Sequence, residues 1–192
     1  MNIVRTFAGT AAALAFSAGA HAALVQTSPT CTASILTPAY TACGGSFAGN
    51  NLNQAADVNA YIGTHFGAGL LFQGSSNEAG TFGPFTSNQT GATGTLTFDA
   101  PVDGPFVLAL KAANEFSLFY FNGVGPAIGS IGYSTLGVAV NANGIPNGLS
   151  HATLYAAGSL PVTAVPEPST YALMLGGLSF IGFLARRRRH PR

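Results

Sequence analysis

Charged residues are scarce in this sequence. Lys, Arg, Asp and Glu make up 7% of its 192 residues, against about 25% in ordinary globular proteins. Solubility must therefore come from Asn, Thr, Ser and Gln side chains. Apolar residues are nevertheless abundant, with 14 phenylalanines among them. The chain thus has enough apolar material for a folded core, which argues against disorder even though it contains 25 glycines.

Cations are almost missing from the middle of the chain. Of the seven basic residues, five stand in the C-terminal Arg186–Arg189 cluster and at Arg192, and Arg5 stands near the N-terminus. Between them lies a single cation, Lys111. Five carboxylates oppose it, which gives residues 23–164 a net charge of −4 with histidine neutral: Asp57, Glu78, Asp99, Asp103 and Glu115. A basic surface for phosphates is thereby excluded, so nucleic acid is not expected as a partner.

Recognisable catalytic motifs are also missing. No G-x-S-x-G nucleophile elbow occurs in the sequence. Ser150 and His151 are adjacent, so a strand would point them to opposite faces and they could not act as a nucleophile and its base. No motif places His65 beside a ligand set, and we expect both histidines at the surface or at the edge of the core. The sequence therefore predicts a protein that is not an enzyme, with no cofactor and with no catalytic or metal site.

Two alternatives remain open for the acidic residues. Asp99, Asp103 and Glu115 could supply the carboxylate pair of a secreted glycosidase, since two acids flank the bond in glycoside hydrolysis. Carboxylates and backbone carbonyls are also the ligands that calcium prefers, although no D-x-[DN]-x-[DN]-G loop is present. Proline and glycine beside Asp99 and Asp103 favour a solvated turn over either role.

Cys31 and Cys43 are the only cysteines. A disulfide between them would close a short loop and would stabilise the fold by about 3 kcal/mol in the chain-entropy model. A metal site would need further ligands, and no histidine lies nearby in the sequence. The sequence therefore favours a disulfide over a metal site or free thiols, and disulfides persist in oxidising compartments.

The N-terminus has the pattern of a secretory signal peptide. Arg5 supplies a positive charge, the run Phe7–Phe16 is apolar and rich in alanine, and small residues end the segment at Ala20-His21-Ala22. The apolar run is too short to remain in a bilayer as a span. We therefore expect signal peptidase to remove residues 1–22 by cleaving the Ala22-Ala23 bond.

The C-terminus has the pattern of a membrane span with a stop-transfer cluster. Residues 171–185 carry no charge, and Arg186, Arg187, Arg188 and Arg189 follow at once. As a helix, this uncharged run would rise about 22 Å, less than the roughly 30 Å of the bilayer core. We therefore expect a marginal span over residues 169–185. The arginine-rich end, residues 186–192, is expected in the cytoplasm, which places the preceding chain outside.

A segment with two prolines, Val165-Pro166-Glu167-Pro168, precedes the expected span. Prolines one residue apart prevent a helix, so an extended and accessible hinge is expected there. Together with the short apolar run and the arginine cluster, the segment resembles the PEP-CTERM sorting signal of Gram-negative bacteria. The resemblance implies that an exosortase, a transpeptidase-like membrane enzyme, recognises residues 165–192 and removes the tail. It further implies an anchor in the inner membrane before processing, and a location at the cell surface or in extracellular polysaccharide afterwards.

Residues 23–164 remain as one exported domain. Residues 44–51 are rich in glycine and asparagine and predict turns, whereas residues 52–62 have apolar side chains near helical spacing and predict one short helix. Short strands are predicted at 69–73, 94–98, 105–111, 115–121, 134–140 and 150–156. We therefore predict a mainly β fold, an antiparallel β-sandwich or a jelly-roll-like domain with one short helix.

The strand sequences carry a second resemblance. Phe106–Ala112, Phe116–Phe121 and Leu149–Tyr155 are similar to the strand pattern of many PEP-CTERM ectodomains. This resemblance implies a sandwich and brings no known activity.

These predictions leave three candidate functions. The first is a non-enzymatic protein of the cell surface or of the extracellular biofilm matrix. The second is a carbohydrate-binding module, in which Phe119, Phe121 and Tyr155 would form an exposed stacking face. The third is the secreted glycosidase described above.

Overall fold

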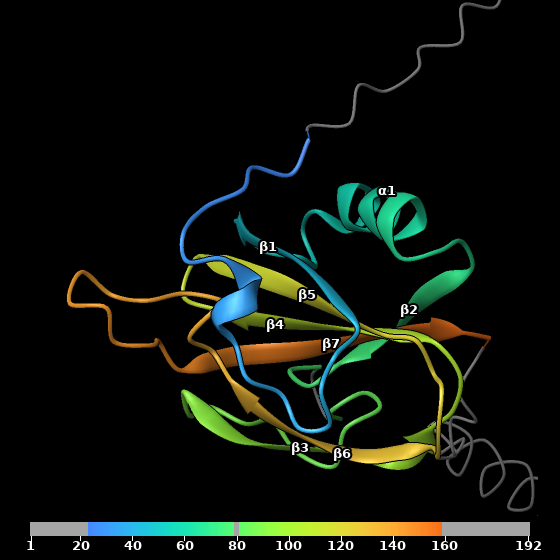
Figure 1. Ribbon diagram of the computed structural model, residues 1–192. Helices are drawn as coiled ribbons and strands as arrows, with labels where there is room; N and C mark the ends of the chain where they lie inside the picture. Colours follow the sequence, from blue (N-terminus) through green and yellow to red (C-terminus); the bar gives the residue numbers. More distant parts are fainter. Residues whose placement is uncertain (1–22, 79–80, 159–192) are drawn as a thin grey trace, which may run out of the picture. The chain divides into compact units, whose positions relative to one another are not determined.

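The computed structural model describes residues 23–78 and 81–158, and Figure 1 shows their arrangement. Contacts divide the chain into two units, Met1–Gly158 and Ser159–Arg192. The predicted signal peptide, sorting segment and membrane span all lie outside the described residues. No helix of the described part is long and apolar enough to cross a membrane.

The described chain is mainly β. Along the sequence its elements are η1 (Cys31–Ala33), β1 (Ala42–Ala48), α1 (Ala55–His65), β2 (Leu70–Ser75), β3 (Thr93–Val102), β4 (Phe106–Ala112), β5 (Glu115–Phe121), β6 (Ile128–Ser134) and β7 (Leu149–Ala157).

Five of the strands form one antiparallel sheet in the order β1-β5-β4-β7-β2. Its centre is the hairpin of β4 and β5, whose last pair joins Ala112 to Glu115 across a two-residue turn. Ala113 in that turn has φ 48°, in the left-handed region that tight hairpin turns require. The strands predicted at 105–111 and 115–121 are thus joined by a tight hairpin turn.

Each face of this sheet is covered by a different element (Figure 1). α1 lies over one face, where Val58 and Ile62 of the helix join Val107 and Ala109 of β4 in a buried cluster. The second sheet, β3 with β6, lies over the other face, and the ring centroid of Phe98 stands 6.2 Å from that of Phe106. Because both faces are covered, all seven residues of β4 are buried.

The sequence-based strand predictions are confirmed at five places and wrong at one. The segments 69–73, 94–98, 105–111, 115–121 and 150–156 correspond to β2, β3, β4, β5 and β7. A strand at 134–140 is absent, because β6 ends at Ser134 and the chain turns there. In that turn the amides of Val138 and Ala139 both donate to the carbonyl of Thr135, at 2.9 and 3.2 Å.

Two elements differ from the prediction, and for β1 the reason is the packing role of a glycine. β1 runs through the segment predicted as turns, and a side chain at Gly44 would place its Cβ 2.4 Å from the hydroxyl of Tyr61. Glycine there makes room for the helix to approach the sheet. The helix itself begins three residues later than predicted and ends at His65.

The fold class is confirmed in its coarse form, two antiparallel sheets and one short helix. The sheets contain five and two strands in the described residues. A jelly roll has eight strands in two Greek keys, so that alternative does not fit these seven strands. The smaller sheet covers the centre of the larger one, and α1 serves as the third layer.

Candidate functional site

A small cavity opens at the end of the sheet where β4 begins and β5 ends. Its volume is about 100 Å³, and it is lined by the stacked rings of Phe106 and Phe121 together with the polar side chains of Thr41, Asp103 and Asn122. Ligand pockets usually enclose about 300–1,000 Å³. This cavity is therefore large enough for a few waters and too small for a sugar ring with its substituents.

The side-chain oxygens of Asp103 and Asn122 at this cavity accept hydrogen bonds from backbone amides of their own loops. A carboxylate oxygen of Asp103 accepts from the amide of Gly104 at 2.9 Å, and the side-chain oxygen of Asn122 accepts from the amide of Val124 at 3.1 Å. The bond of Asn122, which reaches two residues along the chain, is that of an Asx turn. Asp103 is exposed in the loop that its sequence neighbours predict, whereas the turn predicted at Asp99 is wrong, because Asp99 lies within β3.

The acidic residues of the predicted glycosidase pair lie apart. Asp103 precedes β4, whereas Glu115 opens β5 at the opposite end of the hairpin, about 20 Å away at the rise of an extended strand. Asp99 lies in β3, where the pairing with β6 is irregular between Thr97 and Val102. Glycosidases hold their two carboxyl groups roughly 5–9.5 Å apart. Glu115 is therefore too far from Asp103 to form such a pair with it.

The aromatic stacking face predicted for a carbohydrate-binding module is wrong. Phe119, Phe121 and Tyr155 are all buried. Phe119 packs edge-on against Tyr40, with ring centroids 5.2 Å apart, and Tyr155 belongs to the cluster under α1. Alternation along a strand exposes one set of side chains only when one face of the sheet is open to water, and here both faces are covered.

A buried polar network lies between the loop before α1 and the sheet, and no sequence motif predicts it. Asn51, in the loop before α1, donates through Nδ2 to the hydroxyl of Thr153 at 2.9 Å. Its Oδ1 lies 3.0 Å from Nε2 of His151. Since an amide oxygen only accepts, His151 donates from Nε2 and carries its proton there. Asn51 is buried with them and thus joins the loop to β7.

Lys111 stands beside this network. It pairs with His151 across the ladder of β4 and β7, its ammonium donates to the carbonyl of Ala113, and only 7% of its surface is exposed. Burial lowers the pKa of Lys111. Burial first, and the charge of Lys111 second, lower the pKa of His151 to about 4. At neutral pH His151 is therefore uncharged.

The two histidines differ in position. His65 is exposed, and its ring stacks on that of Tyr61 with centroids 4.0 Å apart. His151 is buried more deeply than the predicted core edge. Ser150 is exposed while His151 points inward, so their side chains lie on opposite faces. His151 is buried and already donates to Asn51, so it has a structural role and a solute cannot reach it.

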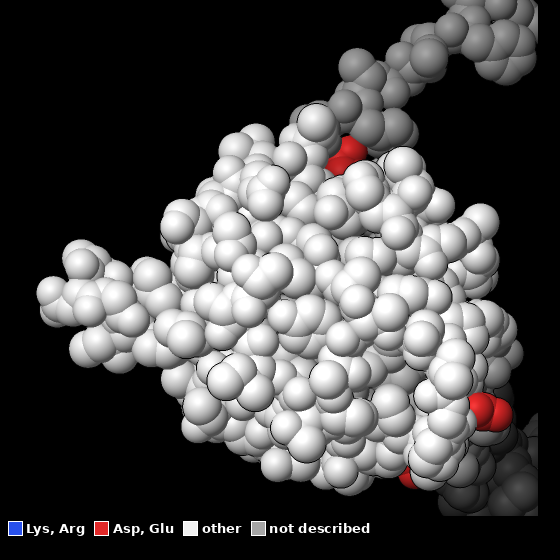
Figure 2. All heavy atoms as spheres, in the orientation of Figure 1, with Lys and Arg blue, Asp and Glu red and all other residues white. Residues whose placement is uncertain are grey.

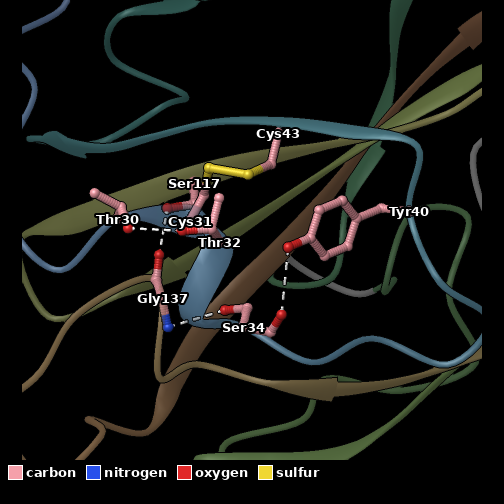
Figure 3. Close-up of a disulfide and its surroundings, with 8 residues drawn as sticks. All are labelled: Thr30, Cys31, Thr32, Ser34, Tyr40, Cys43, Ser117 and Gly137. Atoms are coloured by element: carbon pink, nitrogen blue, oxygen red, sulfur yellow. Dashed lines mark hydrogen bonds between the residues drawn. A yellow bond between two sulfur atoms is a disulfide. The ribbon is translucent and has the colours of Figure 1, made fainter.

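Cys31 and Cys43 form a disulfide, with sulfur atoms 2.06 Å apart (Figure 3). The bond attaches η1 to β1. Neighbouring contacts hold the turn after β6 against the same place, because the amide of Gly137 donates to the hydroxyl of Ser34 at 3.0 Å and its carbonyl accepts from Ser117 at 2.8 Å (Figure 3). No group of three or more His, Cys, Asp or Glu side chains that could hold a metal ion occurs in the described residues.

The sorting residues themselves, Val165 to Pro168 and Arg186 to Arg189, lie outside the described residues, as does the Ala22 side of the predicted signal cleavage. No curated protein and no solved structure matches the chain. Residues 164–189 match the family model of the PEP-CTERM protein-sorting motif, and the match includes both predicted clusters. The chain therefore carries the PEP-CTERM sorting motif of exported proteins that are anchored in the membrane and then processed by an exosortase.

Proposed function

We propose that the protein is a non-enzymatic component of the cell surface or of the extracellular polysaccharide matrix, delivered there by an exosortase. The observation that carries this proposal is the sorting motif at residues 164–189. A C-terminal sorting signal whose apolar part is removed leaves a mature protein without a membrane helix. The folded unit that ends at Gly158 would then be the working part of the protein.

The surface of this unit supports the proposal. Few carboxylates and no cation appear on the face shown in Figure 2, and the surface is otherwise made of uncharged side chains. Neutral polar groups interact with hydrated polysaccharide without strong electrostatic attraction or repulsion. The separation of the acidic residues and the small volume of the end cavity also favour a structural role over catalysis.

A deletion of the gene tests this role. We expect the deletion strain to lose biofilm mass, flocculation or retained polysaccharide, and the wild-type gene to restore the lost property. The matched control is the gene with Pro166→Ala and Pro168→Ala, which alters the sorting segment and leaves residues 23–158 unchanged; it should fail to restore the property. Unchanged behaviour of the deletion strain in all three assays would refute the proposal.

Mass spectrometry of the mature termini tests the delivery step separately. In cells that contain the exosortase, we expect the mature chain to begin at Ala23 and to end near Pro166 to Pro168. In cells that lack the exosortase, the chain should keep Arg192 and remain in the membrane fraction. An intact Arg192 in both strains would mean that the tail is a permanent anchor.

A further inference from the structure

We propose that copies of the folded unit associate head to tail, with Ile145 of one copy seated in the end cavity of the next. The end cavity is the one lined by Phe106 and Phe121 where β4 begins. Ile145 belongs to a hairpin arm, residues 140–147, between β6 and β7. The partner is thus a second copy of this chain, and the contact lets a component of the matrix assemble with itself.

The arm stands out from the rest of the unit in Figure 1 and Figure 2. Val140 pairs with Pro146 across it. At its tip the side-chain oxygen of Asn141 accepts from the amides of Asn143 at 2.9 Å and Ile145 at 3.0 Å. The amide of Asn141 also donates to the carbonyl of Ile145 at 2.9 Å. These bonds fix the exposed arm in one conformation, so it loses little conformational entropy when a partner binds.

The volume of the end cavity matches a branched aliphatic side chain. An apolar cavity of about 150 Å³ takes up benzene, which has six carbons. At the same packing, a cavity of about 100 Å³ takes up about four carbons, and the side chain of isoleucine has this number. Ile145 is 58% exposed. Because it lies on a projection, it can enter a cavity that a side chain on a flat surface cannot reach.

The polar groups of the end cavity need no hydrogen bond from an occupant. Asp103 and Asn122 accept from amides of their own loops, and the hydroxyl of Thr41 accepts from the amide of Asn122 at 3.3 Å. Most of the other lining side chains are apolar, with Phe106 and Phe121 among them. An aliphatic side chain can therefore enter without leaving a buried polar group unpaired, which would cost free energy.

The arm and the end cavity lie at opposite ends of β7. This strand begins at Leu149, directly after the arm, whereas Ala156 near its end pairs with Phe106 at the cavity. The strand between these two residues spans about 23 Å, so a copy cannot place Ile145 in its own cavity. A contact between two different surfaces repeats in one direction, and it produces an open row of copies unless the rotation closes a ring.

The size of the contact makes this association weak. An arm tip in a small cavity buries less than the roughly 1,200 Å² at which stable interfaces begin. Charge does not oppose the contact, because the arm is uncharged and Asp103 is the one charged residue among those that line the cavity. We therefore expect rows of copies to form where copies are crowded together, as they are on a surface that carries many of them.

Disulfide trapping detects such a weak contact, because the linked form accumulates. The chain from Ala23 onward is purified in detergent with Ile145→Cys on the arm and Val124→Cys at the cavity. Val124 lines the cavity and is 86% exposed. The matched control combines Val124→Cys with Ile35→Cys, because Ile35 is 75% exposed and lies outside the arm. Every variant keeps the same tail, so association through the tail contributes equally to each.

We expect the variant with Ile145→Cys and Val124→Cys to form a ladder of linked copies on a non-reducing gel. The yield should exceed that of the Ile35→Cys control at least about ten-fold, the factor expected from burial of one isoleucine side chain. A mixture of the two single variants, Ile145→Cys and Val124→Cys, should give a linked pair and no longer species. Neither single variant should form linked pairs on its own.

Two trapping results would refute the head-to-tail contact. Equal ladders from the Ile145→Cys and Ile35→Cys combinations would show that the copies meet by random collision. Linked pairs from Ile145→Cys alone would show a symmetric contact between two arms, with the cavity unused. Both results are independent of the exosortase and of biofilm formation, so they leave the proposed function to its own tests.

Serine variants provide a second measurement in case the added cysteines disturb the native disulfide. In sedimentation at high protein concentration, Ile145→Ser should show a lower mean mass than the unchanged chain. Ile35→Ser should match the unchanged chain, since it alters an exposed isoleucine outside the arm. Equal mean masses of all three proteins would also refute the contact.

Discussion

The two faces of the five-stranded sheet are both buried, yet they are built differently. The face toward β3 and β6 is apolar along the central strands, with Leu108 of β4, Phe119 of β5 and Leu154 of β7 all fully buried. The face toward α1 begins in the same way but ends at Lys111 and His151, which lie under the loop before the helix. The first face is thus apolar at its centre and holds the hydroxyl of Ser117 through its bond to Gly137, whereas the second face ends in a network of several polar side chains.

The difference shows how a short helix can be attached to a sheet. A buried polar group costs free energy unless it has a hydrogen-bond partner, and here Asn51 supplies partners to both Thr153 and His151. These bonds connect the loop that leads into α1 with β7. The centre of the other face needs no such bonds, because the side chains of Leu108, Phe119 and Leu154 carry no polar atoms.

Truncation on the apolar face should have the largest effect on stability. Phe119→Ala removes a fully buried ring, and we expect the free energy of unfolding to fall by about 4 kcal/mol. Phe72→Ala, which truncates a half-exposed ring of the same sheet, is the control and should cost about 1 kcal/mol. Urea unfolding measures both, and equal losses would mean that the buried face is not the main source of stability.

Removal of the disulfide should have the second-largest effect on the free energy of unfolding. The bond joins residues 12 apart, and its loss in Cys31→Ser with Cys43→Ser should reduce the free energy of unfolding by about 3 kcal/mol. Reduction of the wild-type protein should give a similar change, while the doubly substituted protein should not respond to the reductant. If reduction had no effect on the unfolding midpoint, η1 would be held in place by its hydrogen bonds alone.

Low pH should weaken the polar face and leave the apolar face unaffected. The pKa of His151 is about 4 in the folded protein and near 6.5 in an unfolded chain. Between these two pH values the unfolded chain takes up a proton at His151 more readily than the folded protein does. The neutral histidine therefore contributes its full stabilisation of the fold above about pH 7, and this contribution is lost as the pH falls toward 4. From pH 7 to about pH 4.5, the loss due to this group is about 2 kcal/mol.

Variants of the two histidines isolate that contribution. His151→Gln keeps a donor toward Asn51 and cannot be protonated, so it should flatten the pH dependence by about 2 kcal/mol in urea unfolding at the two pH values. His65→Gln changes an exposed ring and should leave the wild-type pH dependence intact. A pH dependence that survives unchanged in His151→Gln would show that His151 is not its source.

Sequence alone predicted the strands best where local signals were strong. Phe106, Leu108 and Leu110 alternate before a tight turn, and the β4–β5 hairpin follows from that pattern. β1 was missed because Gly44 and Gly45 predict a turn by their local sequence, whereas the ring of Tyr61 packs against Gly44 in the folded protein. Such a contact joins distant parts of the chain, and no local pattern reports it.

For the candidate site, too, local sequence patterns were predictable and contacts between distant residues were not. The sorting motif is contiguous, so its residues could be found from the sequence and the family match agrees. The polar network joins Asn51 to residues about a hundred positions away, and one of several asparagines in this loop gives no local sign of burial. The stacking face failed for a related reason, since Phe119 is hidden by a second sheet whose strand β6 the sequence did not indicate.

Replacement of Lys111 should have the smallest effect on stability and the most specific effect on the network. Lys111→Met keeps an unbranched apolar stem and removes the charge, and the carbonyl of exposed Ala113 can bond to water instead. The change in the free energy of unfolding at pH 7 should be within about 1 kcal/mol, since a buried charge contributes little net stability.

Because the charge of Lys111 helps to lower the pKa of His151, that pKa should rise in the Lys111→Met variant. NMR titration of the imidazole measures it, with His65 in the same spectrum as the internal control. A pKa of His151 that did not rise would show that the ammonium is too well hydrated to act across the ladder, and burial alone would then account for the neutral histidine.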